Sequence, residues 1–251
     1  GRHGAVRFDA AALCTAGPAG AGMNLFADAL QWIFSPERAT GALPLREAIA
    51  THLQFTVLGV VLAGAIAVPA GWAIGHTGRG RGVAVALAGA ARAMPSFGLV
   101  LALVLMFGVL HKAEAAVTAF VLLAIPSILA GAYAGIEAVE RHVLDGAHAV
   151  GMSRWQVLFR VEVPLGLPLL LGGVRSAALQ VVATVTLMGY VGNWGLGFHI
   201  VQGINLRAFD QILGSALLIV VLAISLDGAL ALTQRLVVPH GVRTRQSRAH
   251  R

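Results

Sequence analysis

Residues 55–75 read FTVLGVVLAGAIAVPAGWAIG, and this stretch decides the fold class. No Asp, Glu, Lys or Arg occurs between Glu47 and Arg79, so the stretch lies inside a long uncharged segment. As an α-helix it would be about 31 Å long, which is enough to cross the hydrocarbon of a bilayer. The sequence therefore predicts a membrane-spanning helix at this position.

The composition of the whole chain is also that of a membrane protein. Of the 251 residues, 57% are hydrophobic and only 12% are charged, whereas roughly a quarter of the residues of a soluble domain are charged. Aromatic residues make up 6%, and the 31 glycines and abundant alanines are typical of helices that pack closely inside lipid. These values exclude an ordinary soluble protein and predict one integral membrane domain.

Further apolar stretches follow the first one. They cover residues 83–110, 115–136, 165–191 and 212–236. The first of these is interrupted by Arg92 and Pro95, which predicts a broken helix whose deeper part is 96–109. Arg175 and Asp227 lie inside the last two stretches. We therefore expect an all-α integral membrane protein, a helical bundle of five spans.

Basic residues in the connections predict the orientation, because Lys and Arg are retained on the cytoplasmic side. The basic connections follow the first and third spans and the last span, and they carry Arg79, Arg81, Arg141, Arg154, Arg160, Arg235, Arg243, Arg245, Arg248 and Arg251. The two other connections carry only Lys112 and Arg207. This bias places the N-terminus outside and the C-terminus in the cytoplasm, although the arginines before the first span weakly oppose it.

The rest of the domain organisation follows from composition. Residues 1–22 are rich in Ala and Gly, lack the apolar core of a signal peptide and are expected to be disordered, with Met23 as an alternative start. For residues 23–46 the sequence predicts a short helix that ends at Phe34, followed by a linker. The helix either lies on the outer membrane surface or caps the bundle. The transmembrane domain then covers 47–238, and 239–251 form a basic cytoplasmic tail.

Nothing in the sequence indicates catalysis by this chain. The histidines that an enzyme would need as a base fall in loops or at span ends: His52, His76, His111, His142, His148, His199 and His240. Neither a Gly-x-Ser-x-Gly elbow nor a His-Glu-x-x-His zinc motif occurs, and Cys14 is the single cysteine, so no metal site is expected. The only lysine, Lys112, follows His111, which excludes a Gly-Lys-Ser/Thr phosphate loop. The net charge of +7 lies in loops and tails, and we expect no nucleic-acid partner.

The connection between the third and fourth spans, residues 137–163, is more polar than the others and predicts a partner outside the membrane. It reads Asp145-Gly146-Ala147, three residues, Gly151, nine residues, then Val161-Glu162-Val163-Pro164. This pattern resembles the EAA loop of the permease subunits of binding-protein-dependent ABC importers, which is Glu-Ala-Ala, three residues, Gly, nine residues, Ile-x-Leu-Pro. The spacing agrees throughout. The sequence departs from the pattern at its start, where Asp replaces Glu and Gly replaces the first Ala.

In the family, such a loop is a knob of helix, turn and helix that fits a groove on a cytoplasmic ATPase. The resemblance implies that Asp145, Gly146, Ala147, Gly151, Met152, Arg154, Trp155, Phe159 and Pro164 form the coupling site. The small residues permit close approach, the turn falls at Gly151, and Met152, Trp155 and Phe159 supply apolar contact surface. Asp145 is expected at the N-terminus of the first helix, as a cap or as the partner of a cation. A plain surface hairpin is the alternative for the loop taken alone.

Other segments are similar to permeases of the osmoprotectant branch, which import glycine betaine, choline, carnitine or proline. They are residues 74–82 (IGHTGRGRG), 92–96 (RAMPS), 151–164, 180–184 (QVVAT) and 189–197. The resemblance implies an inner-membrane permease subunit with a second permease subunit, identical or related, and an extracytoplasmic substrate-binding protein. ATP and Mg would be held by the partner ATPase, and no cofactor by this chain. A permease for another small solute such as an amino acid, and a channel or structural membrane protein, are the alternatives.

Polar residues inside the spans are the candidates for a translocation path. They are Ser127, Gln180, Thr184, Thr186, Tyr190 and Trp194, and each could instead make a hydrogen bond between helices. Tyr190 and Trp194 could hold a quaternary ammonium group by cation–π attraction, although the family usually leaves selectivity to the binding protein. For Arg175 a structural ion pair is favoured, and Asp227 is expected to pair with an arginine. For Arg92 we favour snorkelling over a role in the path.

Overall fold

The computed structural model describes residues 18–82, 84, 86, 89 and 95–237. All regular structure in this part of the chain is helical, without a strand. The elements are α1 (Pro18–Phe34), η2 (Pro36–Ala39), α2 (Leu45–Thr77), α4 (Ser96–Phe107), η3 (Val109–His111), α5 (Lys112–Glu137), α6 (Arg141–Ala149), α7 (Arg154–Val157), η4 (Leu158–Glu162), α8 (Val163–Val185), α9 (Met188–Val191), α10 (Gly195–Leu206) and α11 (Phe209–Val237). Arg92 and most of the predicted break lie outside the described residues.

Four helical segments are long and apolar enough to cross a membrane. They are Leu45–Thr77, Val109–Glu137, Arg154–Val191 and Phe209–Leu236, and they contain most or all of the first, third, fourth and fifth predicted spans. The deeper part of the second predicted span corresponds to α4, whose 12 residues are too few to cross alone. The chain is therefore a multi-pass helical bundle.

Small residues bring α5 into contact with α2 on one side and α8 on the other. A Cβ atom on Gly71 of α2 would lie 2.5 Å from the Cβ of Ala132 on α5. One on Gly135 of α5 would lie 2.5 Å from the carbonyl oxygen of Gly166 on α8. At these points the backbones approach so closely that only glycine fits, which explains the high glycine content.

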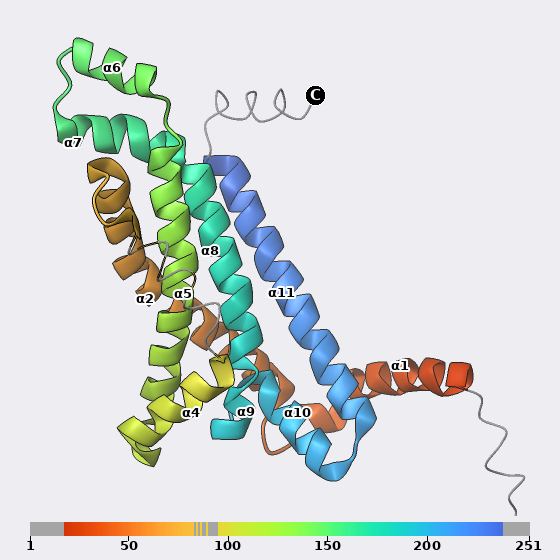
Figure 1. Ribbon diagram of the computed structural model, residues 1–251. Coiled ribbons are helices and arrows are strands. Elements are labelled where there is room, and N and C mark those ends of the chain that lie inside the picture. The colour runs from red at the N-terminus through yellow and green to blue at the C-terminus, as the bar shows by residue number, and fades with distance from the viewer. Residues whose placement is uncertain (1–17, 83, 85, 87–88, 90–94, 238–251) are drawn as a thin grey trace, which may run out of the picture.

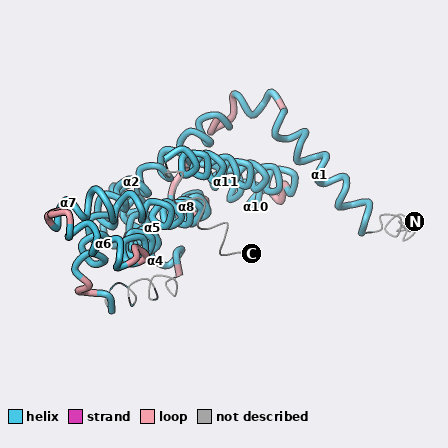
Figure 2. The backbone as a smooth tube through the Cα atoms, turned by 90° about the horizontal axis from the view of Figure 1, so that it is seen from above, coloured by secondary structure: helices cyan, strands magenta, loops and turns pink. Residues whose placement is uncertain are grey.

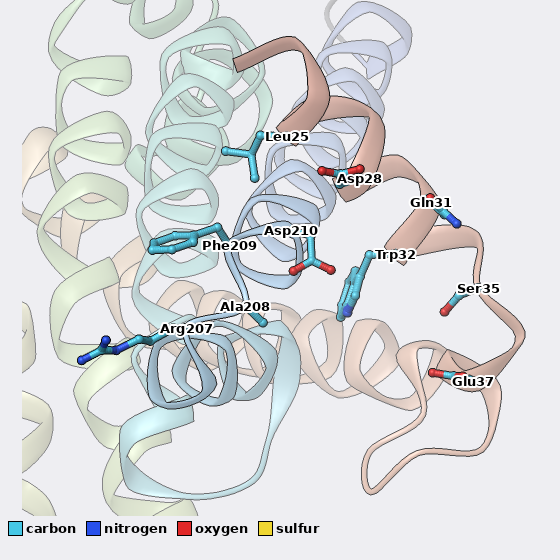
Figure 3. Close-up of a pocket in the computed structure, with 10 residues that line it drawn as sticks. All are labelled: Leu25, Asp28, Gln31, Trp32, Ser35, Glu37, Arg207, Ala208, Phe209 and Asp210. Atoms are coloured by element: carbon cyan, nitrogen blue, oxygen red, sulfur yellow. The ribbon is translucent and has the colours of Figure 1, made fainter. Parts of the chain in front are cut away.

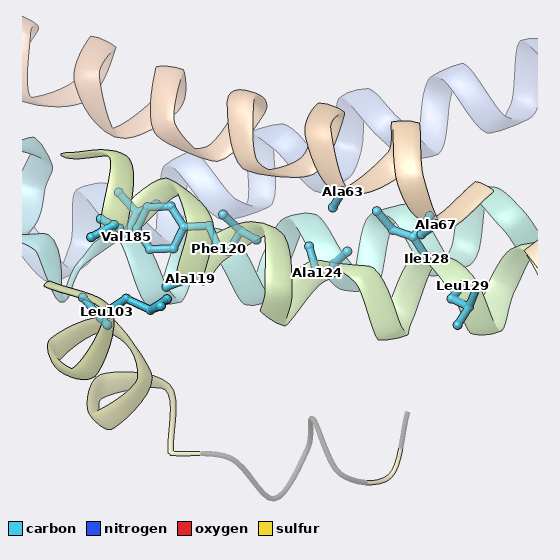
Figure 4. Close-up of a cluster of buried hydrophobic side chains, with 14 of the residues drawn as sticks. Ala63, Ala67, Leu103, Ala119, Phe120, Ala124, Ile128, Leu129 and Val185 are labelled. Atoms are coloured by element: carbon cyan, nitrogen blue, oxygen red, sulfur yellow. The ribbon is translucent and has the colours of Figure 1, made fainter. Parts of the chain in front are cut away.

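The apolar core lies along the same three helices and reaches α4 at one end. Phe120 and Ile128 of α5 are fully buried, together with Ala63 of α2 and Val185 of α8. Figure 4 shows these side chains between the helices, with Leu103 of α4 closing the cluster. The core therefore consists mainly of alanines, with larger apolar side chains at fewer positions.

The two ends of the bundle differ (Figure 1). At one end lie α6 and α7, with the C-terminal ends of α2, α5 and α11. At the other end lie α4, α9, α10 and the start of α11, from which α1 projects away from the bundle, as Figure 2 also shows. This arrangement separates the polar loop of residues 137–163 from the opposite end.

Two expectations about local structure need correction. Residues 18–22, expected to be disordered, are helical and form the start of α1, where Pro18 is tolerated because the first helical position has no backbone acceptor for its missing N–H. The connection between the fourth and fifth spans contains a helix, α10, that the sequence analysis missed. Its 12 residues are too short to be recognised as a span, and its glycines disguise it as a loop.

Candidate functional site

The polar loop is a helical hairpin whose turn falls at Gly151, as predicted. Gly151 has a φ of +83°, which favours glycine because it has no Cβ. Its N–H donates to the carbonyl of His148 at 2.9 Å, and the N–H of Met152 donates to the carbonyl of Ala147 at 3.1 Å. These two bonds satisfy carbonyls at the end of α6 and fix the direction in which the chain leaves it.

The second arm of the hairpin starts with a capping box. The N–H of Gln156 donates to Oγ of Ser153 at 3.4 Å, and the N–H of Ser153 donates to Oε1 of Gln156 at 2.8 Å. From there α7 runs through the π-helical turn η4 directly into α8. Pro164 is the second residue of α8.

The predicted contact residues of the loop differ in exposure. Trp155 and Phe159 are 71% and 54% exposed and stack with their ring centroids 6.1 Å apart. Asp145, Gly146, Gly151 and Arg154 are also exposed, Met152 is half-buried, and Ala147 is buried. The hairpin therefore presents an apolar aromatic surface to solvent, which is unusual unless a partner covers it.

The predicted position of Asp145 at the start of the first helix is wrong. α6 begins at Arg141, with Glu140 in the N-cap position, and Asp145 lies in its second turn. The reason is that residues 141–144 contain no helix breaker, so the helix begins before the motif does. Asp145 therefore does not cap α6, although its exposed carboxylate remains available to a cation on a partner.

The loop is joined to the bundle by contacts that the sequence did not predict. Nδ1 of His76, at the end of α2, donates to Oε2 of Glu162 in η4 at 2.6 Å. The ring of Trp72 meets Phe159 edge-on, with centroids 6.4 Å apart. A hollow of about 500 Å³ separates the rest of α7 from α2. The position of Glu162 just before an apolar span was the one signal in the sequence that it needs a partner. The partner, His76, is 86 residues away and could not be identified from the sequence.

The candidate path residues on α5 and α8 take part in packing. Ser127 is half-buried where α5 meets α8, since a Cβ on Gly173 would lie 2.6 Å from its carbonyl oxygen. Oγ1 of the buried Thr184 donates to the carbonyl of Gln180 at 2.8 Å within the same helix. The backbone of Thr186 is so close to Gly197 of α10 that no Cβ fits there. None of these residues lines the hollow between α7 and α2 or the cleft beside α1.

Tyr190 and Trp194 have separate aromatic partners and do not form one cage. Tyr190 is 56% exposed and meets Phe97 of α4 edge-on at 5.4 Å. Trp194 is half-buried against Phe55 of α2 at 6.0 Å, and Nζ of Lys112 lies 5.3 Å from the centroid of its ring. A cation therefore already occupies one face of Trp194, and it comes from this chain.

His52 lies inside α2, not at a span end, and links three helices. It is fully buried; its Nε2 donates to the carbonyl of Val182 on α8 at 3.0 Å, and the N–H of Leu196 on α10 donates to its Nδ1 at 3.4 Å. Both ring nitrogens are thus used by a neutral imidazole. His199 likewise lies inside α10. The prediction that all histidines fall in loops or at span ends is wrong for these two, because the helices extend further than the apolar stretches.

The ion pair expected for Arg175 and Asp227 is present. Nε of Arg175 donates to Oδ1 of Asp227 at 2.9 Å, and Nη2 donates to Oδ2 at 2.7 Å. Nη1 also donates to Oε1 of Gln234 at 3.4 Å, and Nε2 of Gln234 donates to the carbonyl of Pro168 at 3.1 Å. This network joins α8 to α11, which fits a structural role better than a place in the path.

At the other end of the molecule a cleft of about 620 Å³ opens between α1 and the turn from α10 into α11. In Figure 3, Asp210 of α11 lies beside the buried Trp32, and Asp28 of α1 lies above both in the view. Among the described side chains, Glu37 and Arg207 line the cleft as well.

Comparison with known proteins identifies the class. The family model described as "Binding-protein-dependent transport system inner membrane component" matches residues 65–240. The chain belongs to this family, which confirms the resemblance that the loop indicates. It is accordingly a multi-pass protein of the inner membrane.

Curated relatives cover most of the chain. The glycine betaine/carnitine/choline transport system permease protein OpuCB of Bacillus subtilis (strain 168) is 32% identical over 191 residues, which are 76% of this chain and 87% of that protein. The osmoprotectant import permease protein OsmW of Salmonella typhimurium (strain LT2) is 31% identical over 198 residues, 76% of this chain and 91% of that one. These relatives are named as transport permeases.

Solved structures agree on the fold. A structure of the MetNI methionine ABC transporter in an inward-facing conformation aligns with a TM-score of 0.68 at 20% identity, covering 78% of this chain and 96% of that one. A second, an amino acid ABC transporter crystallised with histidines, aligns with a TM-score of 0.58 at 18% identity, covering 76% and 92%. At these identities the likeness shows the permease fold and nothing about the solute.

Proposed function

We propose that this chain is the permease subunit of an ABC importer for osmoprotectants such as glycine betaine, choline or carnitine. The observation that carries the proposal is the match over 191 residues to a permease whose name specifies these three solutes. Proline is a fourth candidate from the sequence resemblance alone. Uptake of each labelled solute by the whole transporter, in competition with the others, would rank them.

The α6–α7 hairpin is the site where a cytoplasmic ATPase docks. Its exposed Trp155–Phe159 stack and the open surface at Gly146 support this, because an aromatic patch bordered by small residues can insert into a groove. The ATPase would hold ATP and Mg and hydrolyse the nucleotide. This chain would contribute the contact surface and no catalytic group.

The chain crosses the membrane five times, with the N-terminus outside. α4, together with the segment before it, supplies the second crossing. The arrangement of the helix ends supports this topology, because the ends of α2, α5 and α11 lie beside the hairpin (Figure 1) and carry the basic residues of the connections. The hairpin and the C-terminal tail are then cytoplasmic.

A second permease subunit, identical or related, completes the path. A single bundle with α5 buried between α2 and α8 leaves no room for a gated solute path inside it, which supports assembly in pairs. A binding protein delivers the solute at the end opposite the hairpin, where a cleft opens beside α1. Closure of the ATPases would then alternate access.

Deleting residues 145–160 tests the docking site. We expect the tagged wild-type chain to copurify from mild detergent with an ATP-binding subunit, identified by mass spectrometry, and the deleted chain to insert in the membrane without it. A matched control replaces Val150, which is exposed but lies outside the aromatic stack, by Ser. Normal copurification of the deleted chain would refute the docking proposal, and a wild-type chain found alone would favour a channel or structural protein.

A further inference from the structure

A part-buried polar contact between His76 and Glu162 joins η4 to α2. The side chain of Glu162 is 6% exposed and that of His76 is 22% exposed. A carboxylate can only accept, so Nδ1 of His76 carries the hydrogen of this 2.6 Å bond. Since a buried carboxylate without a partner is costly, the two side chains keep their contact when either helix moves.

The segment that contains Glu162 is mechanically distinct from its neighbours. η4 is a π-helical turn over Leu158–Glu162, between the last residue of α7 and the first of α8. Such turns hold one extra residue per turn and frequently mark functional sites inside longer helices. Here the turn allows α7 to change direction relative to α8 without breaking the helix.

The remaining contact between α7 and α2 leaves space for such a change. The hollow of about 500 Å³ is lined by Pro69, Trp72 and Ala73 on α2 and by Trp155 and Leu158 on the other side. The edge-on pair of Trp72 and Phe159 lies at its border. In Figure 1 α7 lies across the end of α2. A push on α7 could therefore close the hollow, whereas the His76–Glu162 pair would carry the push into α2.

α2 is suited to pass that motion to the far end of the bundle. It is one helix of 33 residues, with His76 near its C-terminal end, His52 in its N-terminal part and Pro69 between them. Pro69 cannot donate a backbone hydrogen bond, but the helix continues through it. His52 is bonded to α8 and α10. Displacement of the cytoplasmic end of α2 would thus reach the elements beside Trp194 and Tyr190.

We infer that the His76–Glu162 pair is the tie through which the docked ATPase moves α2, with η4 as the flexible joint. The inference rests on the proposed function, since it requires an ATPase on the hairpin. His76 and Glu162 are positioning residues in this scheme: they touch neither solute nor nucleotide. Their loss should therefore uncouple transport from ATP hydrolysis without preventing docking.

Three double variants of the complete transporter test the tie. H76L/E162L removes both polar groups together, so that no buried charge is left unpaired. H76Q/E162Q keeps a neutral hydrogen bond, and it also serves if the leucine variant fails to fold. The matched control is R81Q/E137Q, because Arg81 and Glu137 form an exposed 2.9 Å ion pair at the same end of the bundle but outside α6 and α7.

The measurements are copurification of the ATPase, glycine betaine uptake into proteoliposomes, and ATPase activity with and without loaded binding protein. We expect the H76L/E162L transporter to keep its ATPase bound. The amount of solute taken up per ATP hydrolysed should fall about tenfold, which is a typical coupling effect. H76Q/E162Q should be intermediate, and the control should resemble wild type.

Two results would overturn the inference. One is wild-type uptake and stimulation in H76L/E162L. The other is loss of the ATPase from both variants of the pair but not from the control, which would assign the pair to docking. Failure of the wild-type chain to bind an ATPase would instead refute the proposed function itself.

Discussion

The centre of the bundle and the elements around it are held by different kinds of contact. α5 meets α2 and α8 through glycines and alanines at backbone distance, with Gly135 against Gly166 as the closest approach. By contrast, Arg175–Asp227 attaches α11 to α8, and His76–Glu162 attaches the hairpin to α2. α10 is held in both ways, by the bond to His52 and by the close approach of Gly197 to the backbone of Thr186. Close packing fixes the spacing of α5 from α2 and α8, whereas the attachment of the hairpin and of α11 depends on a few polar contacts.

The largest effect is expected when a methyl group is added at the centre. Gly135→Ala places a Cβ 2.5 Å from the carbonyl oxygen of Gly166, so α5 and α8 must separate. We expect destabilisation by about 3 kcal/mol, the upper range for overpacking, seen as a lower Tm in detergent.

The control for this change is Gly172→Ala, on the same interface helix α8. No atom lies within 4 Å of a Cβ at Gly172, and alanine favours the helix by about 1 kcal/mol over glycine. A raised or unchanged Tm is expected. If Gly135→Ala left the Tm as high as the control does, close packing would not be what holds α5 against α8.

A smaller effect is expected from removing the buried link to α10. His52→Leu leaves the N–H of Leu196 without its acceptor in a buried place, which costs about 1–3 kcal/mol. His148→Leu is the control, because its ring is exposed and its bond to the carbonyl of Leu144 stays within α6. Thermal unfolding of both variants gives the comparison, and equal Tm values would show that His52 holds nothing in place.

The link to α11 should matter less still. Arg175 and Asp227 are each about one-third exposed at the surface of the bundle, and an arginine left alone there can extend its long side chain toward the membrane interface, which recovers part of the lost stabilisation. Asp227→Ala is expected to lower the Tm by less than His52→Leu does. The double variant R175L/D227L should recover much of that loss, because no charge is left unpaired. A double variant as unstable as the single one would contradict this account.

Contacts between residues close together in the sequence could be predicted, whereas most contacts between distant residues could not. Local signals were sufficient to predict the long helices, the turn at Gly151 and the hairpin form of the polar loop. Arg175 and Asp227 could be expected to pair, because charges within apolar stretches need partners. The His76–Glu162 bond could not be predicted, since nothing in a sequence indicates which of several histidines reaches a given glutamate. For the same reason the six path candidates remain predictions, and none of them lines the hollow beside α7 or the cleft beside α1.

The smallest effect concerns Lys112, which attaches the start of α5 to Trp194 by a cation–π contact. Lys112→Met removes the charge but keeps an apolar chain of similar length, so the stability should fall by only about 0.5 kcal/mol. The change also frees one face of Trp194. If that face lines the solute path, the KM for choline uptake should fall, because a quaternary ammonium no longer competes with the lysine. Arg207→Met, an exposed cation at the same end, is the control and should leave KM unchanged. An unaltered KM in both variants would remove Trp194 from the path and leave it as a peripheral packing residue.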